Sequence, residues 1–139
     1  CGPQTGYEGD LGIDLCTPES LVLPARGSAL VDTGIRIRIP EVPDSLREHF
    51  QLGCFIWAKS GLSVKSNIEK GAGVVDPGYT GPLRIKLYNH GDADVHFAPG
   101  DKIAQMVFML CAKISAVVEV DLEHVSTERG ERGFGSSGR

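Results

Sequence analysis

Leu83-Arg-Ile-Lys-Leu-Tyr88 places an apolar side chain at every second position of the chain. This period of two is typical of a β-strand that buries one face and exposes the other. Ile35-Arg-Ile-Arg-Ile39 repeats the pattern, and the short apolar run at residues 53–58 is typical of a strand buried on both faces. The chain is therefore expected to consist mainly of strands.

Other short apolar stretches, bounded by turn-forming residues, continue along the chain. Residues 103–110 are apolar enough to be buried on both faces. Only residues 44–50, with Asp44 as the N-cap, and residues 62–68 suggest helix, and both are too short for a helical layer. Further strands are expected at residues 21–23, 29–31, 95–97 and 117–120. About ten short strands joined by turns predict an all-β fold, a distorted jelly-roll β-barrel or sandwich.

The composition is that of one ordinary globular domain. With 139 residues, 41% of them hydrophobic and 23% charged, the chain can bury one core, and its 18 glycines and 8 prolines favour many turns. The net charge of −4 gives no general attraction for nucleic acid. No apolar run approaches the ~20 residues that span a membrane. We therefore expect neither a nucleic-acid partner nor a membrane partner.

The cysteines show no metal-binding or disulfide pattern. They are widely spaced, which does not suit a zinc site or a disulfide framework, so we expect reduced core cysteines. Residues 1–10 are Gly-rich and polar, like a flexible lead-in, and lack the features of a secretory signal. The four histidines lie apart, in dissimilar contexts, and are expected on the surface. An intracellular location, in cytoplasm or nucleus, is the resulting prediction.

Three segments combine glycine with polar side chains beside expected strands. In Gly73-Val-Val-Asp-Pro-Gly-Tyr-Thr-Gly81, the local interpretation of Asp76 is a turn-initiating residue, and that of Tyr79 a half-buried hairpin aromatic. Lys59-Ser-Gly61 can present donors to phosphate, although such a turn is usually only a turn, and the upstream glycine of a P-loop is missing. Gln105 interrupts an apolar run, so it either braces the core or faces a site.

The C-terminal stretch differs from the rest of the chain. Residues 127–139 contain Phe134 as their single large apolar side chain, and their composition favours a disordered tail. Glycine N–H groups, serine hydroxyls and an arginine fork also suit a loop that grips phosphate. We therefore divide the chain into a β-domain at residues 1–127 and a flexible C-terminal arm at residues 128–139 that orders only over a ligand.

Taken in order, these segments resemble the five motifs of the homotrimeric dUTP pyrophosphatase (dUTPase) family. Each motif alone is weak evidence, but five in family order and spacing cover nearly the whole chain from residue 10. They are Gly12-Ile-Asp-Leu15 with Leu30-Val-Asp-Thr-Gly34, Lys59-Ser-Gly61, residues 71–81, Gly100-Asp-Lys-Ile-Ala-Gln105 and residues 129–138.

The resemblance implies hydrolysis of dUTP to dUMP and pyrophosphate, which limits uracil incorporation into DNA and supplies dUMP. Asp76 matches the carboxylate that positions the attacking water and contacts the 3′-OH. Tyr79 matches the ring that packs on deoxyribose and leaves no room for a 2′-OH. A hairpin at residues 73–84 matches the element whose backbone reads uracil. Its substrate contacts are implied for Gly73, Val74, Val75 and Arg84.

The resemblance also implies a phosphate side of the site. Lys59, Ser60, Gly61 and Gln105 match positions that bind the phosphate chain or its waters. Asp14 matches the acid that reaches Mg²⁺ through water, while the three phosphates chelate most of the ion. The arm that closes on the γ-phosphate and stacks an aromatic ring over uracil matches Arg129, Phe134, Gly135, Ser136 and Ser137.

In the family, three subunits share each site: one gives motifs one, two and four, a second the hairpin and a third the arm. The resemblance thus implies a homotrimer. The chain departs from the family at Lys59, where arginine is usual and gives a planar fork instead of a point charge. Pro82 replaces an acidic or polar residue, and Arg132 a small one.

Two alternatives remain open from the sequence. One is a dCTP deaminase of the same superfamily, which residues 129–138 and the Tyr79 hairpin fit less well. The other is a non-catalytic binding or regulatory protein on the same scaffold, against which Asp76, Tyr79, Gln105 and Phe134 argue. Pyrophosphate release from dUTP, dCTP, dTTP and UTP separates these readings.

Overall fold

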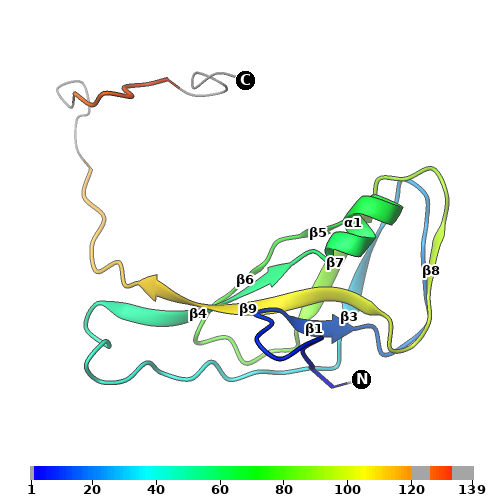
Figure 1. The fold of residues 1–139 in the computed structure, drawn as a ribbon, viewed down its shortest axis with the longest axis horizontal. Helices are drawn as coiled ribbons and strands as arrows, with labels where there is room; N and C mark the ends of the chain where they lie inside the picture. Colours follow the sequence, from blue (N-terminus) through cyan, green and yellow to red (C-terminus); the bar gives the residue numbers. More distant parts are fainter. Residues whose placement is uncertain (1, 120–125, 133–139) are drawn as a thin grey trace.

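Strands dominate the computed structural model, which describes residues 2–119 and 126–132 (Figure 1). The single helix of this described part is α1, Ser60–Ser66. The strands are β1 Ile13–Cys16, β2 Leu21–Leu23, β3 Ser28–Asp32, β4 Phe50–Trp57, β5 Ile68–Gly71, β6 Val74–Val75, β7 Arg84–Asn89, β8 Val95–Phe97 and β9 Lys102–Ala112. The all-β prediction is confirmed, and the described strands form open sheets and no closed barrel.

The strands form three antiparallel sheets. The largest has the order β1-β9-β4-β6, the second β3-β7-β5, and β2 pairs with β8. In Figure 1, β4 and β9 run side by side along the length of the molecule. Their register places Trp57 opposite Gln105, and β1 places Asp14 opposite Gln105 from the other side. This register aligns three of the segments singled out in the sequence.

The core is aliphatic, as the scarcity of aromatic residues predicts. β7 alternates as expected, with Ile85 and Leu87 buried and Arg84 and Tyr88 exposed. Phe97 is the one aromatic side chain among the buried hydrophobic residues of the described chain. Among the hydrophobic side chains larger than alanine, those with the least exposure are Leu15, Leu23, Cys54, Ile68, Ile85, Leu87 and Ile103.

Residues 35–39 alternate in burial but do not form a strand. Ile39 is buried and Ile35 and Ile37 are half-buried against the core, as the period of two predicts. The prediction of a strand here is nevertheless wrong, because the segment lies outside the paired ladders of the three sheets. Alternating apolar and charged residues indicate that one face of an extended segment is covered. The backbone of such a segment need not be hydrogen-bonded to a neighbouring strand.

Two predictions about the C-terminal half are also wrong. Residues 103–110 are not buried throughout: Ile103 and Ala104 are inaccessible, whereas Met109 and Leu110 are 38% and 51% exposed. Residues 117–119 form no core strand, since Val117 and Val118 are exposed and the chain leads away from the sheets after β9 (Figure 1). Residue 120 lies outside the described residues. Among residues 2–119 and 126–132, no side chain covers these apolar groups.

Smaller differences concern local structure. Residues 44–49 form turns instead of a helical turn, and the Asp44 carboxylate contacts Arg47 at 2.7 Å instead of capping. The lead-in is not free, because the N–H of Asp14 donates to the carbonyl of Gln4 at 2.8 Å. The helix expected near residues 62–68 is α1, which begins two residues earlier.

The cysteine and histidine predictions agree with the described residues. Cys16 and Cys54 are free and buried, and Cys111 is free and half-buried. His49, His90 and His96 are exposed; Cys1 and His124 lie outside the described residues. Within residues 2–119 and 126–132 there is no helix with the length and apolar character that crossing a membrane requires.

We expect Leu87→Ala to lower the free energy of unfolding by about 2–5 kcal/mol, because it leaves a cavity where β7 meets the core. Val64→Ala on α1, where the side chain is 82% exposed, is the matched control and should change it by less than about 0.5 kcal/mol. Urea unfolding of both variants measures the difference. Equal effects would contradict the assignment of Leu87 to the core.

Candidate active site

A cavity of about 230 Å³ opens around Asp76 and Tyr79. One wall consists of residues 71–76 and the other of residues 82–85, with Ile56 between them. We call this cavity the slot. Its size and its two backbone walls suit a flat, ring-sized ligand.

Asp76 begins a tight turn at the mouth of the slot. The N–H of Tyr79 donates to the Asp76 carbonyl at 2.9 Å, which confirms the turn predicted from Asp-Pro-Gly. The Asp76 carboxylate is exposed. It has no hydrogen-bond or ion-pair partner among the described residues, so it does not take the structural role that an Asx turn often gives, and it is open to a ligand.

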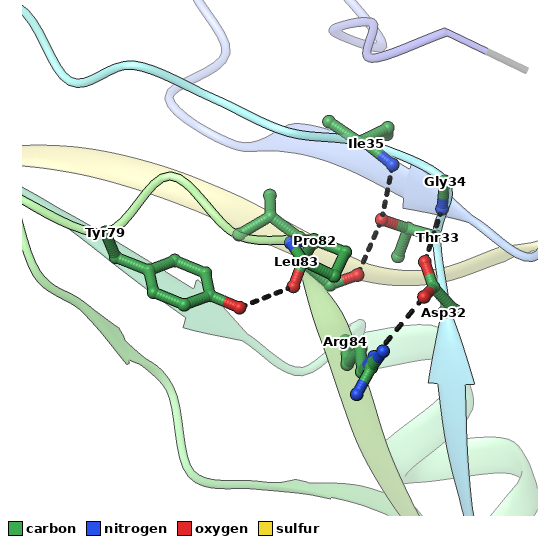
Figure 2. Close-up of polar contacts among 8 residues, drawn as sticks. All are labelled: Asp32, Thr33, Gly34, Ile35, Tyr79, Pro82, Leu83 and Arg84. Atoms are coloured by element: carbon green, nitrogen blue, oxygen red, sulfur yellow. Dashed lines mark hydrogen bonds and ion pairs between the residues drawn. The ribbon is translucent and has the colours of Figure 1, made fainter.

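Tyr79 is held at the same mouth by its hydroxyl, which donates to the Pro82 carbonyl at 2.9 Å (Figure 2). A Cβ at residue 81 would lie 2.5 Å from this hydroxyl oxygen, so the ring requires glycine at that position. The ring is 45% exposed, which leaves one face available to pack on a ligand.

The expected hairpin at residues 73–84 is open, and its two arms belong to different sheets. Val74 and Val75 in β6 pair with β4, whereas β7, beginning at Arg84, pairs with β3 and β5. The prediction of a paired hairpin is therefore wrong. The splayed arms form the two walls of the slot, which leaves space for a ligand between them.

A second group of polar side chains gathers around Asp14. The buried Asp14 carboxylate accepts from Lys59 Nζ at 2.5 Å and from Lys102 Nζ at 2.7 Å. Burial raises the pKa of Asp14, but the hydrogen bonds and charges of Lys102 and Lys59 outweigh burial and leave that pKa below its usual value. The hydrogen bond to Asp14 raises the pKa of Lys102. Asp14 and Lys102 are therefore charged at neutral pH.

Gln105 joins this group by packing on β1. Its Nε2 donates to the Ala58 carbonyl at 3.0 Å, just before Lys59. Its side chain lies so close to Gly12 that a Cβ there would overlap Oε1. Gln105 thus both braces the strands and lines the pocket formed by Asp10, Asp14, Lys59 and Lys102. We call these lining residues, with Gln105, the lysine cluster.

Ser60 and Gly61 follow Lys59 directly as the first residues of α1, and both are exposed. Arg129 lies in a turn in which its Nε donates to the Arg132 carbonyl at 2.8 Å. The remaining predicted arm residues, Phe134, Gly135, Ser136 and Ser137, lie outside the described residues.

The slot and the lysine cluster lie at opposite edges of one sheet. β1 and β6 are the two edge strands of the order β1-β9-β4-β6, so they are about 14 Å apart at the usual strand spacing. Asp14 aligns with Trp57, whereas Val75 aligns with Cys54, about 10 Å further along β4. One subunit therefore does not bring its own Asp76 and Asp14 together.

Sequence reasoning overlooked Lys102 and Thr33. Lys102 is part of a quoted motif, but its spacing from Asp14 gives no sign that they meet. Thr33 is buried, and its hydroxyl donates to the Leu83 carbonyl at 2.8 Å in the wall of the slot. A threonine next to Asp and Gly reads as a turn residue, so only the pairing of β3 with β7 reveals this contact.

A family model described as dUTPase matches residues 2–138. The chain belongs to the dUTPase family. Deoxyuridine 5′-triphosphate nucleotidohydrolases from Oryza sativa subsp. japonica and Yarrowia lipolytica are each 39% identical to it. Both alignments cover 98% of this chain, with 73% of the rice protein and 81% of the yeast protein. The predicted family and enzyme class agree with these names.

Solved structures of other dUTPases share the fold. A mutant of the Staphylococcus bacteriophage 80alpha dUTPase, solved with dUpNHpp, has a TM-score of 0.79 at 22% identity and covers all of this chain and 92% of its own. A mutant dUTPase from phage phi11 of S. aureus, described with a structural Mg(II) ion, has a TM-score of 0.67 at 20% identity, covering 89% and 91%. This likeness supports the jelly-roll type of the dUTPase sandwich.

We expect Asp14→Asn to lower the melting temperature of this dUTPase at neutral pH by several degrees, because two lysines lose their shared carboxylate. Since the folded pKa of Asp14 is lowered, its contribution is present above the usual value of 3.8 and is lost as pH falls through the folded pKa. Because the folded pKa of Lys102 is raised, its contribution to stability is present below pH 10.5 and is lost as pH rises through the folded pKa.

Thermal melts of both proteins across this pH range measure the gap in melting temperature. A gap that stays constant into strong acid would contradict an ionised Asp14 between two lysines.

Proposed function

We propose that this protein hydrolyses dUTP to dUMP and pyrophosphate. The observation that carries the proposal is the exposed Asp76 carboxylate at the mouth of the slot, beside the half-exposed ring of Tyr79. The family of the chain and the names of its relatives support it. Hydrolysis of dUTP keeps uracil out of DNA and supplies dUMP.

The slot selects the nucleoside in this proposal. Residues 73–75 and 84 line the cavity, and backbone N–H and C=O groups in fixed walls can match the donor and acceptor pattern of uracil. A methyl group on the ring has no room between two anchored walls. The Tyr79 ring packs on the sugar, where a 2′-OH would collide with it.

Asp76 acts on water in the chemical step. Its carboxylate accepts a proton from a water molecule as the water oxygen forms a bond to the α-phosphorus. The bond from that phosphorus to the bridging oxygen breaks, and pyrophosphate leaves with the bond's electron pair. The exposed position of Asp76 supports this role, because a carboxylate already committed to protein hydrogen bonds is a weaker proton acceptor.

The lysine cluster, with Ser60 and Gly61, binds the phosphate chain. Its two lysines are offset by the carboxylates of Asp14 and Asp10, so the formal charge of the cluster is zero. A triphosphate therefore needs positive charge from elsewhere. We assign this to Mg²⁺ and to the arginines of the arm, beginning with Arg129.

Mg²⁺ fits the donor set as an ion carried by the nucleotide. No group of three or more His, Cys, Asp or Glu side chains that could hold a metal ion occurs in the described part of the chain. Of the described residues, Asp14 alone offers a buried carboxylate, and it lies in the cluster assigned to the phosphates, which suits contact through water. When bound, the ion neutralises phosphate charge and fixes the phosphate geometry.

Each active site is shared between subunits in this proposal. A nucleotide must reach both the slot and the lysine cluster, and these lie at opposite edges of the sheet in one chain. A homotrimer brings the slot of one subunit to the cluster of the next. The apolar side chains of Met109, Leu110, Val117 and Val118, exposed in one subunit, support such an assembly.

Three further parts of the proposal rest on the sequence. Residues 128–139 act as an arm that closes over the nucleotide, with Phe134 and residues 135–137 as contacts. Residues 1–127 form the β-domain. The protein works inside the cell, in cytoplasm or nucleus, without a nucleic-acid or membrane partner.

Asp76→Asn should reduce kcat for dUTP by at least about a thousandfold, because an amide cannot accept the proton from water. Its melting temperature should stay unchanged, because Asp76 is exposed. Pyrophosphate release from dUTP, dCTP, dTTP and UTP with Mg²⁺ measures the reaction. The proposal fails if dUTP is not strongly preferred or if the variant retains its rate. Ammonia release from dCTP would indicate a deaminase. Tight binding of dUTP without turnover would indicate a non-catalytic protein.

Mixing two inactive variants tests the shared site. Asp76→Asn and Gln105→Leu, unfolded together in equal amounts and refolded, should recover about a quarter of wild-type activity, because random trimers give some sites both intact residues. Each variant refolded alone is the control. A site contained in one chain would recover no activity, and a solution mass other than about three times 14.9 kDa would also contradict the trimer.

A further inference from the structure

The wall of the slot at residues 82–85 is held by residues 32–35, at and just after the end of β3 (Figure 2). Thr33 is buried, and both its N–H and its hydroxyl donate to the Leu83 carbonyl, at 3.1 and 2.8 Å. The N–H of Leu83 donates to the Ile35 carbonyl at 2.8 Å. The Ile35 N–H in turn donates to the Thr33 hydroxyl oxygen at 3.3 Å. One hydroxyl thus connects both segments.

The residues on either side of Thr33 fix its position. Gly34 adopts a left-handed backbone, with φ of 70°, and its N–H donates to Asp32 Oδ1 at 2.9 Å. The other carboxylate oxygen of Asp32 contacts Arg84 Nε at 3.3 Å. The Gly34 N–H first, and then Arg84, hold the pKa of Asp32 below its usual value. We call residues 32–35 the clamp.

At the clamp, the regular antiparallel pairing of β3 with β7 gives way to hydrogen bonds in a shifted register. In a regular antiparallel pair, the Leu83 N–H would donate to the Thr33 carbonyl. It donates instead to Ile35, two residues further on, so the ladder of β3 and β7 ends at this point. The Thr33 hydroxyl supplies the additional bond that keeps the shifted wall in place.

The opposite wall has a separate anchor. The Gly73 carbonyl accepts from the Ile56 N–H at 2.7 Å, and Val74 and Val75 pair with β4. Apart from Gly71, which ends β5 and pairs with Lys86 of β7, the two walls therefore belong to different sheets, and no ladder between β6 and β7 sets their spacing beyond that pair. At residues 82–85, the distance between the two walls depends on the clamp. The position of the Tyr79 ring depends on the clamp too, because its hydroxyl donates to the Pro82 carbonyl.

We propose that Thr33 is a positioning residue for nucleotide selection, which acts by holding the Leu83 carbonyl and with it the wall that reads the base. This inference rests on the proposed function. Backbone recognition of a base needs donors and acceptors held to within a fraction of an ångström. A loosened wall accepts cytosine and uracil more equally, and it releases the Pro82 carbonyl that orients Tyr79.

Thr33→Val tests this role because valine keeps the shape of threonine and removes the hydroxyl. We expect the ratio of kcat/KM for dUTP to kcat/KM for dCTP to fall about five- to tenfold. This factor corresponds to the free energy of one neutral hydrogen bond. KM for dUTP should rise by a similar factor with kcat within about twofold. Thr33→Ser keeps the hydroxyl and should restore both values.

Thr17→Val is the matched control. Thr17 is equally buried, and its hydroxyl donates to the Glu19 carbonyl at 2.7 Å, outside the clamp and the slot walls. It should lose thermal stability as Thr33→Val does and keep its preference for dUTP. Should Thr33→Val fail to fold, Asp32→Asn, which keeps the acceptor for Gly34 and weakens the contact to Arg84, should lower the same ratio about threefold.

Amide hydrogen exchange separates this inference from the proposed function. Thr33→Val should accelerate exchange at Ile35 and Leu83 and leave the core amides of β4 and β9 unchanged, whatever the protein hydrolyses. An unchanged dUTP preference, unchanged exchange at Ile35 and Leu83, or an equal loss of preference in Thr17→Val would each overturn the role of Thr33. A wild-type protein with no preference for dUTP would overturn the proposed function, and nucleotide selection by Thr33 with it.

Discussion

The pairing of β9 with β4 over eight residue pairs is the constraint on which the rest of the structure depends. It sets Gln105 opposite Trp57, and the pairing of β9 with β1 then brings Asp14 to the same level. The lysine that follows β4 and the lysine that begins β9 can meet Asp14 only in this register. A shift by one residue would turn Gln105 to the opposite face and separate the group.

The same sheet order keeps the two halves of the chemistry apart. β6 can pair only with the free edge of β4, so Asp76 emerges at the edge opposite to β1. The result is a subunit with an open slot and a separate lysine cluster, each formed without the other. In the proposed trimer, these two half-sites on opposite edges become complete when copies of the chain meet.

Much of the fold could be predicted from the sequence because burial leaves a periodic signal. β7 and the strands near residues 21–23, 29–31, 53–58 and 95–97 were recognisable from apolar spacing alone. The same signal failed at residues 35–39, where one face is covered but the backbone has no ladder, and at residues 117–119, where Val117 and Val118 are apolar but exposed. Apolar character predicts burial somewhere, and it does not distinguish a core from a contact with another chain.

The sequence by itself determined the all-β class, the turn at Asp76 and, through the order of five motifs, the dUTPase family. These follow from short-range chemistry: side-chain periodicity, turn preferences and spacing along the chain. Only the tertiary structure decided that Lys59 and Lys102 share Asp14, that the walls of the slot come from different sheets, and that Thr33 holds one of them. Each of these contacts joins residues about 20 or more positions apart, where strand register, and not local sequence, determines which side chains meet.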